Sequence, residues 1–325
     1  MTLRLAIAGF GKIATTRHVP AIAEVGGVEL VAIADPLAKS ADVPHFPSLD
    51  RLLKEGPDID AVTLCTPPQV RGAQALLALE ARKHVMLEKP PGATVSEIAP
   101  LVAAAGTARR TLFATWHSRF APAVEPARER LAGRKLKSVE IIWKEDVRVW
   151  HPGQDWIFAA GGFGVFDPGI NALSILTRIL PRPVFVTRAG LGVPANREAP
   201  IVVDMDMRDA TGLPIKAVFD FRPTGPHTWD IRIETDRGPL ILSAGGAKMS
   251  DGDKGVVDAL KAEYPALYRR FVELTSKVRA MSISRRFRSW RTRSWWASGT
   301  PSNHSSSEHD DDEIPYRSRS LRPHA

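Results

Sequence analysis

The stretch "LRLAIAGFGKIATTRHVPAI", residues 3–22, decides how the chain begins to fold. Its first six residues are mostly apolar and predict a buried strand. Gly9-Phe10-Gly11-Lys12-Ile13-Ala14 follows, a G-x-G-x-x-A pattern that opens a helix near Lys12. Gly9 permits a tight turn, Gly11 lets a pyrophosphate approach the backbone, and the small Ala14 lets helix and strand pack closely. Residues 9–14 are therefore predicted to bind a dinucleotide, with an unliganded glycine turn as the alternative.

Asp35 ends the next apolar run, "VELVAIAD", and bears on the choice of cofactor. A carboxylate there can accept hydrogen bonds from both hydroxyls of an adenosine ribose. It would repel a 2′-phosphate, and the next residues, Pro36 and Leu37, include no arginine to offset that repulsion. Lys39 is close in sequence, so NAD is the expected cofactor and NADP the alternative.

The first 120 residues alternate short apolar runs with helical patterns. The runs "AVTLCTP", "HVMLEKP" and "TLFATWH" are typical of buried parallel strands, and residues 70–81 have the pattern of an amphipathic helix. This alternation predicts an α/β Rossmann domain, a doubly wound parallel sheet, over residues 1–120.

The pattern changes after "SRFAPAVEPARERLAG", itself a predicted helix. Alternating strands dominate from there, namely "SVEIIWKEDVRVW", "IVVDMDM", "IKAVFDF" and "TWDIRIET", with one helix from about Pro168 to Leu180. Residues 121–275 are predicted to form an α+β substrate-binding domain with an open, mostly antiparallel or mixed sheet faced by helices.

The composition is that of an ordinary globular protein, with 44% hydrophobic and 25% charged residues among 325. No apolar run approaches the roughly 18 residues of a membrane helix, and the N-terminal run is too short and glycine-interrupted for a signal peptide. A cytoplasmic location without a membrane partner is expected. Cys65 is the single cysteine, which excludes a disulfide framework or a cysteine zinc site. The nine histidines lack zinc-ligand spacing, so no metal is expected.

The net charge of +8 is concentrated at the C-terminal end. Residues 276–325 hold ten Lys or Arg against five Asp or Glu, which accounts for +5 and leaves +3 for residues 1–275. The segment "SRRFRSWRTRSWW" has the pattern of a nucleic-acid-binding arm, and "SNHSSSEHDDDE" is a low-complexity segment. Because the rest of the chain is close to neutral, no nucleic-acid partner is expected.

Three further stretches resemble one family. "EKPPGAT", "WKEDVRVWHPGQDW" and "FDPGINA" resemble the Gfo/Idh/MocA oxidoreductases, and "GKIATTRHVPAI", "CTPPQVR", "FATWHSR" and "GVFDPGINALSI" most resemble its bacterial aldose 1-dehydrogenases, which act on D-galactose or L-arabinose. The resemblance covers about residues 3–275. It implies oxidation of C1 of a pyranose to a 1,5-lactone with NAD(P), and a homodimer paired through the second-domain sheet. The alternatives are another sugar or inositol dehydrogenase of the family, or a regulator that binds NAD or sugar without turnover.

Three residues are candidates for catalysis. Lys89 follows the carboxyl end of a parallel strand, where such sheets bind ligands, although an exposed loop lysine is equally compatible with the pattern. Asp167 before Pro168 is also typical of a helix N-cap. The resemblance matches Asp167 and Asn171 to the family's D-x-x-x-H pair, with Asn in place of a frequent His. Since Asn cannot act as an acid or base, proton abstraction would fall to Asp167 with Lys89, while Asn171 holds hydroxyls. The resemblance also implies a cis bond before Pro90.

The resemblance assigns the remaining site residues. It implies cofactor contacts at Thr66, Pro67, Glu88 and Lys89. It implies a sugar pocket lined by His117, Glu145, Trp150, His151 and Trp229. A flat tryptophan suits the apolar face of a pyranose, whereas glutamate or histidine suits its hydroxyls. Each of these residue types alone is more often core packing or solvated surface.

The C-terminal segment departs from the family. Its relatives close with an apolar helix resembling "PLxLVADAFLxG", and this chain has no such string. When the codons that can encode "RAMSISRRFRSWRTRSWWA" are shifted by one base, one permitted translation is a similar apolar segment. Met281 and the three tryptophans constrain this translation, because each of these residues has a single codon. The hypothesis is a frameshift near residues 276–279, which makes residues 276–325 an aberrant, disordered tail.

Overall fold

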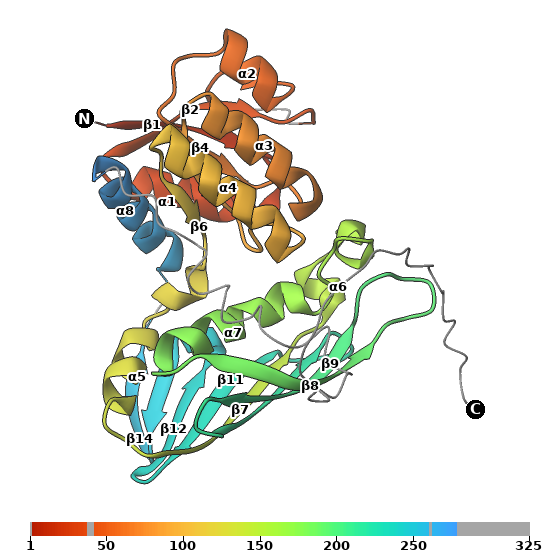
Figure 1. Cartoon of the computed structure of the whole chain (residues 1–325), viewed down its shortest axis with the longest axis vertical. Helices are drawn as coiled ribbons and strands as arrows, with labels where there is room; N and C mark the ends of the chain where they lie inside the picture. Colours follow the sequence, from red (N-terminus) through yellow and green to blue (C-terminus); the bar gives the residue numbers. More distant parts are fainter. Residues whose placement is uncertain (1, 38–41, 260–261, 278–325) are drawn as a thin grey trace, which may run out of the picture. The chain divides into compact units, whose positions relative to one another are not determined.

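The structure is a computed structural model that describes residues 2–37, 42–259 and 262–277 (Figure 1). These residues belong to one compact unit that contains two β-sheets. Among the described helices, none has the length and apolar character needed to cross a membrane. The frameshift hypothesis concerns residues that, apart from Ser276 and Lys277, lie outside the described ranges. The predicted boundaries at residues 120 and 275 stay predictions.

The first sheet has six parallel strands in the order β3-β2-β1-β4-β5-β6. Its strands are β1 Leu3–Ala8, β2 Val28–Ala34, β3 His45–Phe46, β4 Ala61–Leu64, β5 His84–Leu87 and β6 Leu112–Ala114. The order runs outward in both directions from β1 and β4, so the switch point lies between them. Ligands of such sheets bind outside the carboxyl ends of the strands at that point. The predicted Rossmann architecture is confirmed.

Helices cover both faces of this sheet because successive strand residues point to opposite sides. One face, with Ala6 and Ala8 of β1, packs against α2 Leu49–Glu55, α3 Pro68–Glu80 and α4 Val95–Ala108. The other face, with Leu5 and Ile7, packs against η1 Ala14–His18, α1 Val19–Glu24 and α8 Glu263–Ser276. Helix α8 comes last in the described sequence, yet it lies beside α1 (Figure 1). The first sheet thus depends on a helix that follows the second sheet in the chain.

The second sheet has eight strands in the order β14-β13-β12-β11-β7-β10-β9-β8. They are β7 Leu136–Lys144, β8 Val184–Gly192, β9 Val202–Asp209, β10 Pro214–Asp220, β11 Thr228–Thr235, β12 Gly238–Ser243, β13 Lys248–Asp251 and β14 Lys254–Asp258. Only β7 and β10 pair in parallel, and all other neighbours are antiparallel. The predicted mixed sheet is confirmed.

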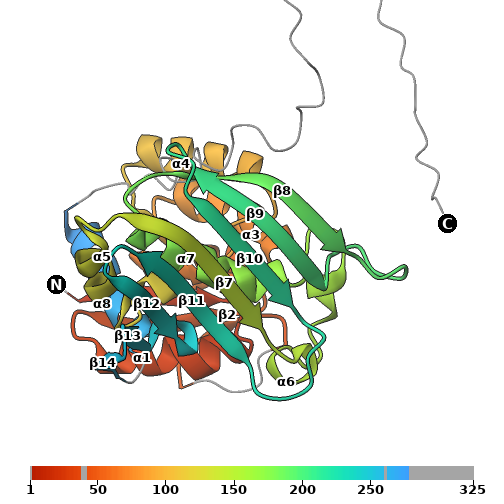
Figure 2. The ribbon, with the colours of Figure 1, turned by 90° about the horizontal axis from the view of Figure 1, so that it is seen from below.

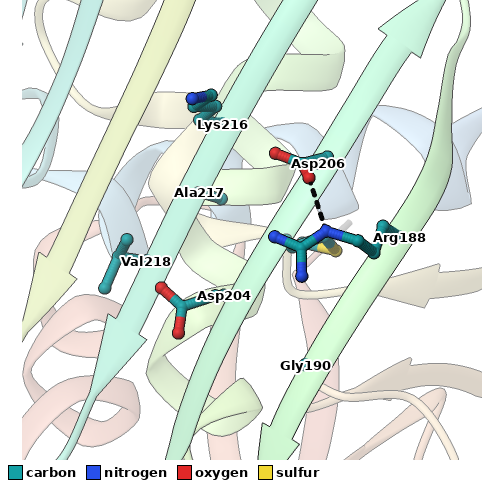
Figure 3. A pocket seen from close by; sticks show the side chains of 8 residues that line it. Arg188, Gly190, Asp204, Asp206, Lys216, Ala217 and Val218 are labelled. Carbon is teal, nitrogen blue, oxygen red and sulfur yellow. Dashed lines mark hydrogen bonds and ion pairs between the residues drawn. The ribbon is translucent and has the colours of Figure 1, made fainter.

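Two helices, α5 Val124–Leu131 and α7 Phe166–Ile179, cover one face of the second sheet. Figure 2 shows the strands in front of α7, seen from the opposite face. On that face, charged side chains surround a shallow hollow (Figure 3). Arg188 donates to Asp206 there over 2.8 Å, and Asp204 and Lys216 line the same hollow.

Short helical turns complete the fold: η2 His117–Phe120, α6 Val147–Trp150, η3 Asp155–Phe158 and η4 Ala244–Gly246. The predicted strand over residues 138–150 is therefore wrong at its end. Strand β7 stops at Lys144, and the carboxylate of Asp146 accepts the backbone N–H of Arg148 over 3.0 Å. This cap starts the helical turn that carries Trp150.

The start of α7 also differs from the prediction. The helix begins at Phe166, its N-cap is Val165, and no side chain caps it. Asp167 is therefore inside the first turn, and the N-cap interpretation of its carboxylate is wrong. Carbonyls of the glycine-rich loop accept the first backbone N–H groups of the helix in place of a capping side chain. The N–H of Asp167, for example, donates to the carbonyl of Gly164 over 3.0 Å. The carboxylate of Asp167 is left to bond elsewhere.

Candidate active site

The glycine turn follows β1 directly. Gly9 has a φ of +85°, and a Cβ atom on it would lie 2.8 Å from the backbone nitrogen of Thr66. Glycine meets both demands without strain. A Cβ on Gly11 would have no atom within 4 Å, so this position borders open space. Ala14 is fully buried against the sheet. The turn has the close packing and the open approach that a pyrophosphate needs.

Asp35 lies at the carboxyl end of β2 and bonds to the glycine turn. Its Oδ2 accepts the backbone N–H of Phe10 over 2.7 Å, and its Oδ1 accepts that of Leu37 over 2.7 Å. At the start of the helical segment, Lys12 is exposed and Ile13 is half-buried. The structure thus brings these predicted cofactor residues together, and a ribose contact by Asp35 stays a prediction.

The loops after β4 and β5 are joined by the guanidinium of Arg71 on α3. Arg71 is only 3% exposed. Its Nε donates to the carbonyl of Thr66 over 3.0 Å, and its Nη1 donates to the carbonyls of Glu88 and Pro90. Burial lowers the pKa of Arg71, and the charge of Glu88 opposes this effect. Since Thr66 and the N-cap Pro67 form the first loop, Arg71 fixes both predicted cofactor loops.

Lys89 and Asp167 form an ion pair between the two sheets. The Nζ of Lys89 lies 2.8 Å from Oδ2 of Asp167 and 3.2 Å from its carbonyl oxygen. The two side chains are 14% and 6% exposed. Asn171 is half-buried one turn further along α7, and its carbonyl accepts the hydroxyl of Ser174 over 2.8 Å. The peptide bond between Lys89 and Pro90 is cis, as the resemblance implies.

The carboxylate of Glu88 is buried beneath Lys89. Its Oε1 lies 3.0 Å from Nε2 of His18 and 2.8 Å from the hydroxyl of Tyr264, and its Oε2 accepts the backbone N–H of Lys89 over 2.8 Å. Burial alone would raise the pKa of Glu88, but the hydrogen bond from His18 and the charges of His18, His117 and Lys89 hold it well below its ordinary value. These contacts favour the ionised form of Glu88, and its predicted cofactor contact stays a prediction.

Four of the five predicted sugar-binding residues lie in one cluster near the end of β7. Oε1 of Glu145 is 3.0 Å from Nε2 of His151, and Oε2 of Glu145 accepts the indole N–H of Trp229 over 2.9 Å. The ring of Trp229 lies 4.8 Å from the ring of Trp150 and 3.9 Å from the ring of His227. Glu145 is 3% exposed, whereas Trp150 is 37% exposed. A buried carboxylate beside partly exposed rings can recognise both hydroxyls and an apolar sugar face.

His117, the fifth predicted sugar-binding residue, bonds to a different element. Its Nδ1 lies 2.7 Å from Oε2 of Glu263 at the start of α8, and its ring stacks on Tyr264 at 5.4 Å. The contacts of His117 therefore tie η2 to α8. Among the described residues, the hydrogen bonds and ring contacts of His117 go to Ser118, Glu263 and Tyr264 and not to the cluster around Glu145.

Known proteins resemble most of this chain. The chain is 46% identical to the galactose 1-dehydrogenase of Pseudomonas fluorescens over 275 residues, which are 84% of this chain and 88% of the relative. A family model described as an oxidoreductase family with an NAD-binding Rossmann fold matches residues 3–115. The chain belongs to the Gfo/Idh/MocA oxidoreductases.

Two solved structures are similar to this chain. The crystal structure of a D-galactose-1-dehydrogenase protein from Rhizobium etli superposes with a TM-score of 0.82 at 53% identity, covering 86% of this chain and 90% of that chain. The 3-ketoreductase KijD10 from Actinomadura kijaniata, in complex with NADP and TDP-benzene, superposes with a TM-score of 0.78 at 18% identity over 86% of this chain and 91% of that chain. The second likeness shows the shared fold alone.

As a Gfo/Idh/MocA member, the chain is an oxidoreductase whose cofactor is NAD or NADP. Its residues fit that cofactor. Gly11 leaves open space in front of the helix start, and Gly9 brings the turn against the loop at Thr66. Asp35 holds the turn from the adjacent strand end. Within the described ranges, no three His, Cys, Asp or Glu residues gather as metal ligands would.

Several residues of the site were not predicted. Arg71, His18, Tyr264 and His227 each bond to, or pack on, a predicted residue. Arg71 lies in the "CTPPQVR" string, but no local pattern indicates that its guanidinium turns inward toward three carbonyls. Tyr264 is 176 residues from Glu88 in sequence. Such contacts depend on tertiary packing, which periodicity does not report.

Proposed function

We propose that the chain is an NAD(P)-dependent aldose 1-dehydrogenase that oxidises C1 of D-galactose, L-arabinose or both to the 1,5-lactone in sugar catabolism. The observation that carries this proposal is the ion pair of Lys89 with Asp167, 2.8 Å apart, at the carboxyl end of the first sheet. The two galactose dehydrogenase relatives support the substrate class. A cytoplasmic location belongs to the same proposal.

The ion pair can carry the proton chemistry of this oxidation. The C1 hydroxyl of a hemiacetal is more acidic than an ordinary alcohol, so a carboxylate can take its proton. We assign that step to Asp167, while the ammonium of Lys89 stabilises the negative charge developing on the sugar oxygen. The amide of Asn171, one turn along α7, can donate to one hydroxyl and accept from another. The bound NAD(P) supplies the acceptor for the hydride from C1.

The cluster around Glu145 is proposed to hold the pyranose ring. Glu145 accepts hydrogen bonds from its protein neighbours and, as a carboxylate, can accept from a sugar hydroxyl as well. Trp150 and Trp229 offer flat apolar surfaces. D-Galactose and L-arabinose share their configuration at C2, C3 and C4 and differ by one exocyclic CH2OH. A pocket discriminates such a group weakly, so activity on both sugars is expected.

A homodimer through the second sheet is also proposed. The face opposite α7 carries interspersed charges of both signs, among them Arg188, Asp204, Asp206 and Lys216 (Figure 3). In two copies related by a twofold axis, positive side chains of one copy could face negative side chains of the other. A mass measured by light scattering that equals one chain would contradict the dimer.

The test of the function is a panel of sugars mixed with the full chain and NAD or NADP, followed by absorbance of the reduced cofactor. Turnover with D-galactose or L-arabinose is expected. Turnover with inositol but neither aldose would favour another dehydrogenase of the family. Tight NAD binding without turnover of any sugar would contradict the proposal and favour a binding regulator.

A further inference from the structure

A buried polar network joins the last described helix to the loop of Lys89. Tyr264 on α8 donates its hydroxyl to Oε1 of Glu88 over 2.8 Å, and Nε2 of His18 reaches the same oxygen over 3.0 Å. Tyr268, one turn further along α8, lies 2.8 Å from Nδ1 of His18 and 3.3 Å from the hydroxyl of Thr63. All five side chains are buried.

The network ends at the backbone of Lys89. The second carboxylate oxygen of Glu88 accepts the N–H of Lys89 over 2.8 Å, and the hydroxyl of Thr115 accepts the same N–H over 3.0 Å. The side chain of Lys89 then extends to Asp167. A continuous series of hydrogen bonds therefore leads from Tyr264 through Glu88 and Lys89 to Asp167.

This arrangement restrains the orientation of the Glu88 carboxylate. A carboxylate can rotate about its last carbon bond unless donors fix both oxygens. Here His18 and Tyr264 fix Oε1, which leaves Oε2 directed at the backbone of Lys89. Loss of one donor would leave a buried charge under-satisfied, and the carboxylate could then turn away from Lys89.

We propose that Tyr264 and His18 are positioning residues for catalysis: through Glu88 they hold the backbone of Lys89 so that its ammonium meets Asp167. This inference rests on the proposed function of the Lys89–Asp167 pair. Its competitor is a purely structural role, in which the network only attaches α8 to the sheet.

Tyr264→Phe separates the two roles because it removes one hydroxyl and keeps the ring. Phe271→Leu is the matched control: Phe271 lies on the same helix, is fully buried, packs on Phe113 at 5.9 Å, and has no polar side-chain atom to join the hydrogen bonds of the network. Positioning predicts that Tyr264→Phe lowers kcat about tenfold with little change in the KM for sugar, because the Glu88 carboxylate loses one of the donors that orient it. Phe271→Leu should lower Tm and keep the parental kcat.

A double-mutant cycle with Glu88→Gln adds a second kinetic readout. If Tyr264 acts through Glu88, the loss in kcat for the double variant will be smaller than the product of the two single losses. Multiplicative losses, or a Tyr264→Phe chain with lowered Tm and parental kcat, overturn the inference.

A chemical readout keeps the inference testable if the chain oxidises no sugar. Lys89 is partly exposed, so an amine-acetylating reagent can label it, and mass spectrometry of the peptides gives its rate. Tyr264→Phe is expected to raise the labelling rate of Lys89 several-fold, while Phe271→Leu keeps the parental rate. Unchanged labelling of Lys89 in Tyr264→Phe overturns the positioning role, whatever the sugar panel shows.

Discussion

The two sides of the candidate site are built differently. On the Lys89 side, Arg71 and Glu88 are each 3% exposed and are held by hydrogen bonds that span several elements. On the sugar side, the rings around Glu145 come from α6, β11 and the residues next to them, and Trp150 is 37% exposed. We infer that the reacting pair requires a fixed, dry support. The surface that recognises the sugar can vary without disturbing that support.

The largest expected effect concerns the reacting pair itself. Asp167→Asn keeps the size of the side chain but removes the base, so kcat should fall about 10²–10⁴-fold, the range of general base catalysis. Lys89→Met removes the ammonium and leaves the carboxylate. Lys89→Met should therefore retain part of the turnover that Asp167→Asn loses, because its base is intact. Parental turnover by Asp167→Asn would show that another group takes the proton.

The support beneath Lys89 is tested by Arg71→Gln. The shorter amide cannot reach all three carbonyls, and buried carbonyls without donors are costly, so the free energy of unfolding should fall by about 2–4 kcal/mol. Urea unfolding followed by fluorescence measures this change. The control is Arg51→Gln, whose side chain is 57% exposed and pairs with Glu55. Exposed pairs contribute about 0–1 kcal/mol, and equal losses in the two variants would contradict a rigid support.

The sugar side is tested by Glu145→Gln. The amide replaces one acceptor oxygen with a donor, so it cannot accept from both His151 and Trp229. We expect the KM for D-galactose to rise about tenfold, which corresponds to about 1.4 kcal/mol, with a smaller change in kcat. Glu140→Gln, on an exposed position of the same strand, is the control. A fall in kcat at unchanged KM would place Glu145 on the catalytic side instead.

The smallest expected effect is the pH dependence of stability on the Lys89 side. Burial opposes charge on His18, yet Cys65, Tyr268 and Glu88 hold its pKa well above the ordinary value. Its stabilisation is therefore complete below about pH 6.5 and is lost as pH rises through the raised value. The lowered pKa of Glu88 has the opposite sense: its stabilisation is present above about pH 4.3 and is lost as pH falls.

Unfolding of the parent and of His18→Gln between pH 5 and 9 measures this dependence. As the solution becomes alkaline, the free energy of unfolding of the parent should fall by on the order of 1 kcal/mol more than that of His18→Gln. Parallel curves for the two chains would show that His18 is neutral in the folded state. In that event the contact of His18 with Glu88 would be a hydrogen bond from a neutral imidazole and not an ion pair.

Local patterns predicted much of the fold. The strand "TWDIRIET" is β11 over the predicted residues, because its alternation matches one buried and one exposed face. The prediction failed where a side chain redirected the backbone into another element, or formed a hydrogen bond with a residue distant in sequence. Asp146 capped a helical turn inside a predicted strand, and Asp167 bonded to Lys89 instead of capping α7.

The same distinction between local and long-range contacts separates the predicted site residues from those that were missed. Gly9 was found from a glycine motif within one turn, and Asp35 from its place at the end of the next strand. The sugar cluster was found through the resemblance, and His227 joined it only through ring packing. Tyr264 carries no local sign of its role, because its partner Glu88 follows β5, 176 residues earlier in the chain. Long-range polar contacts are therefore what the sequence alone leaves open.

The most direct test of the central claim uses D-galactose carrying deuterium at C1. The full chain is incubated with this sugar and NAD, and the mass of the reduced cofactor is measured. Oxidation at C1 predicts that each reduced cofactor gains one deuterium while the sugar becomes the lactone or its aldonic acid. Reduced cofactor without deuterium would show that the hydride leaves another carbon, and the assignment of an aldose 1-dehydrogenase would be wrong.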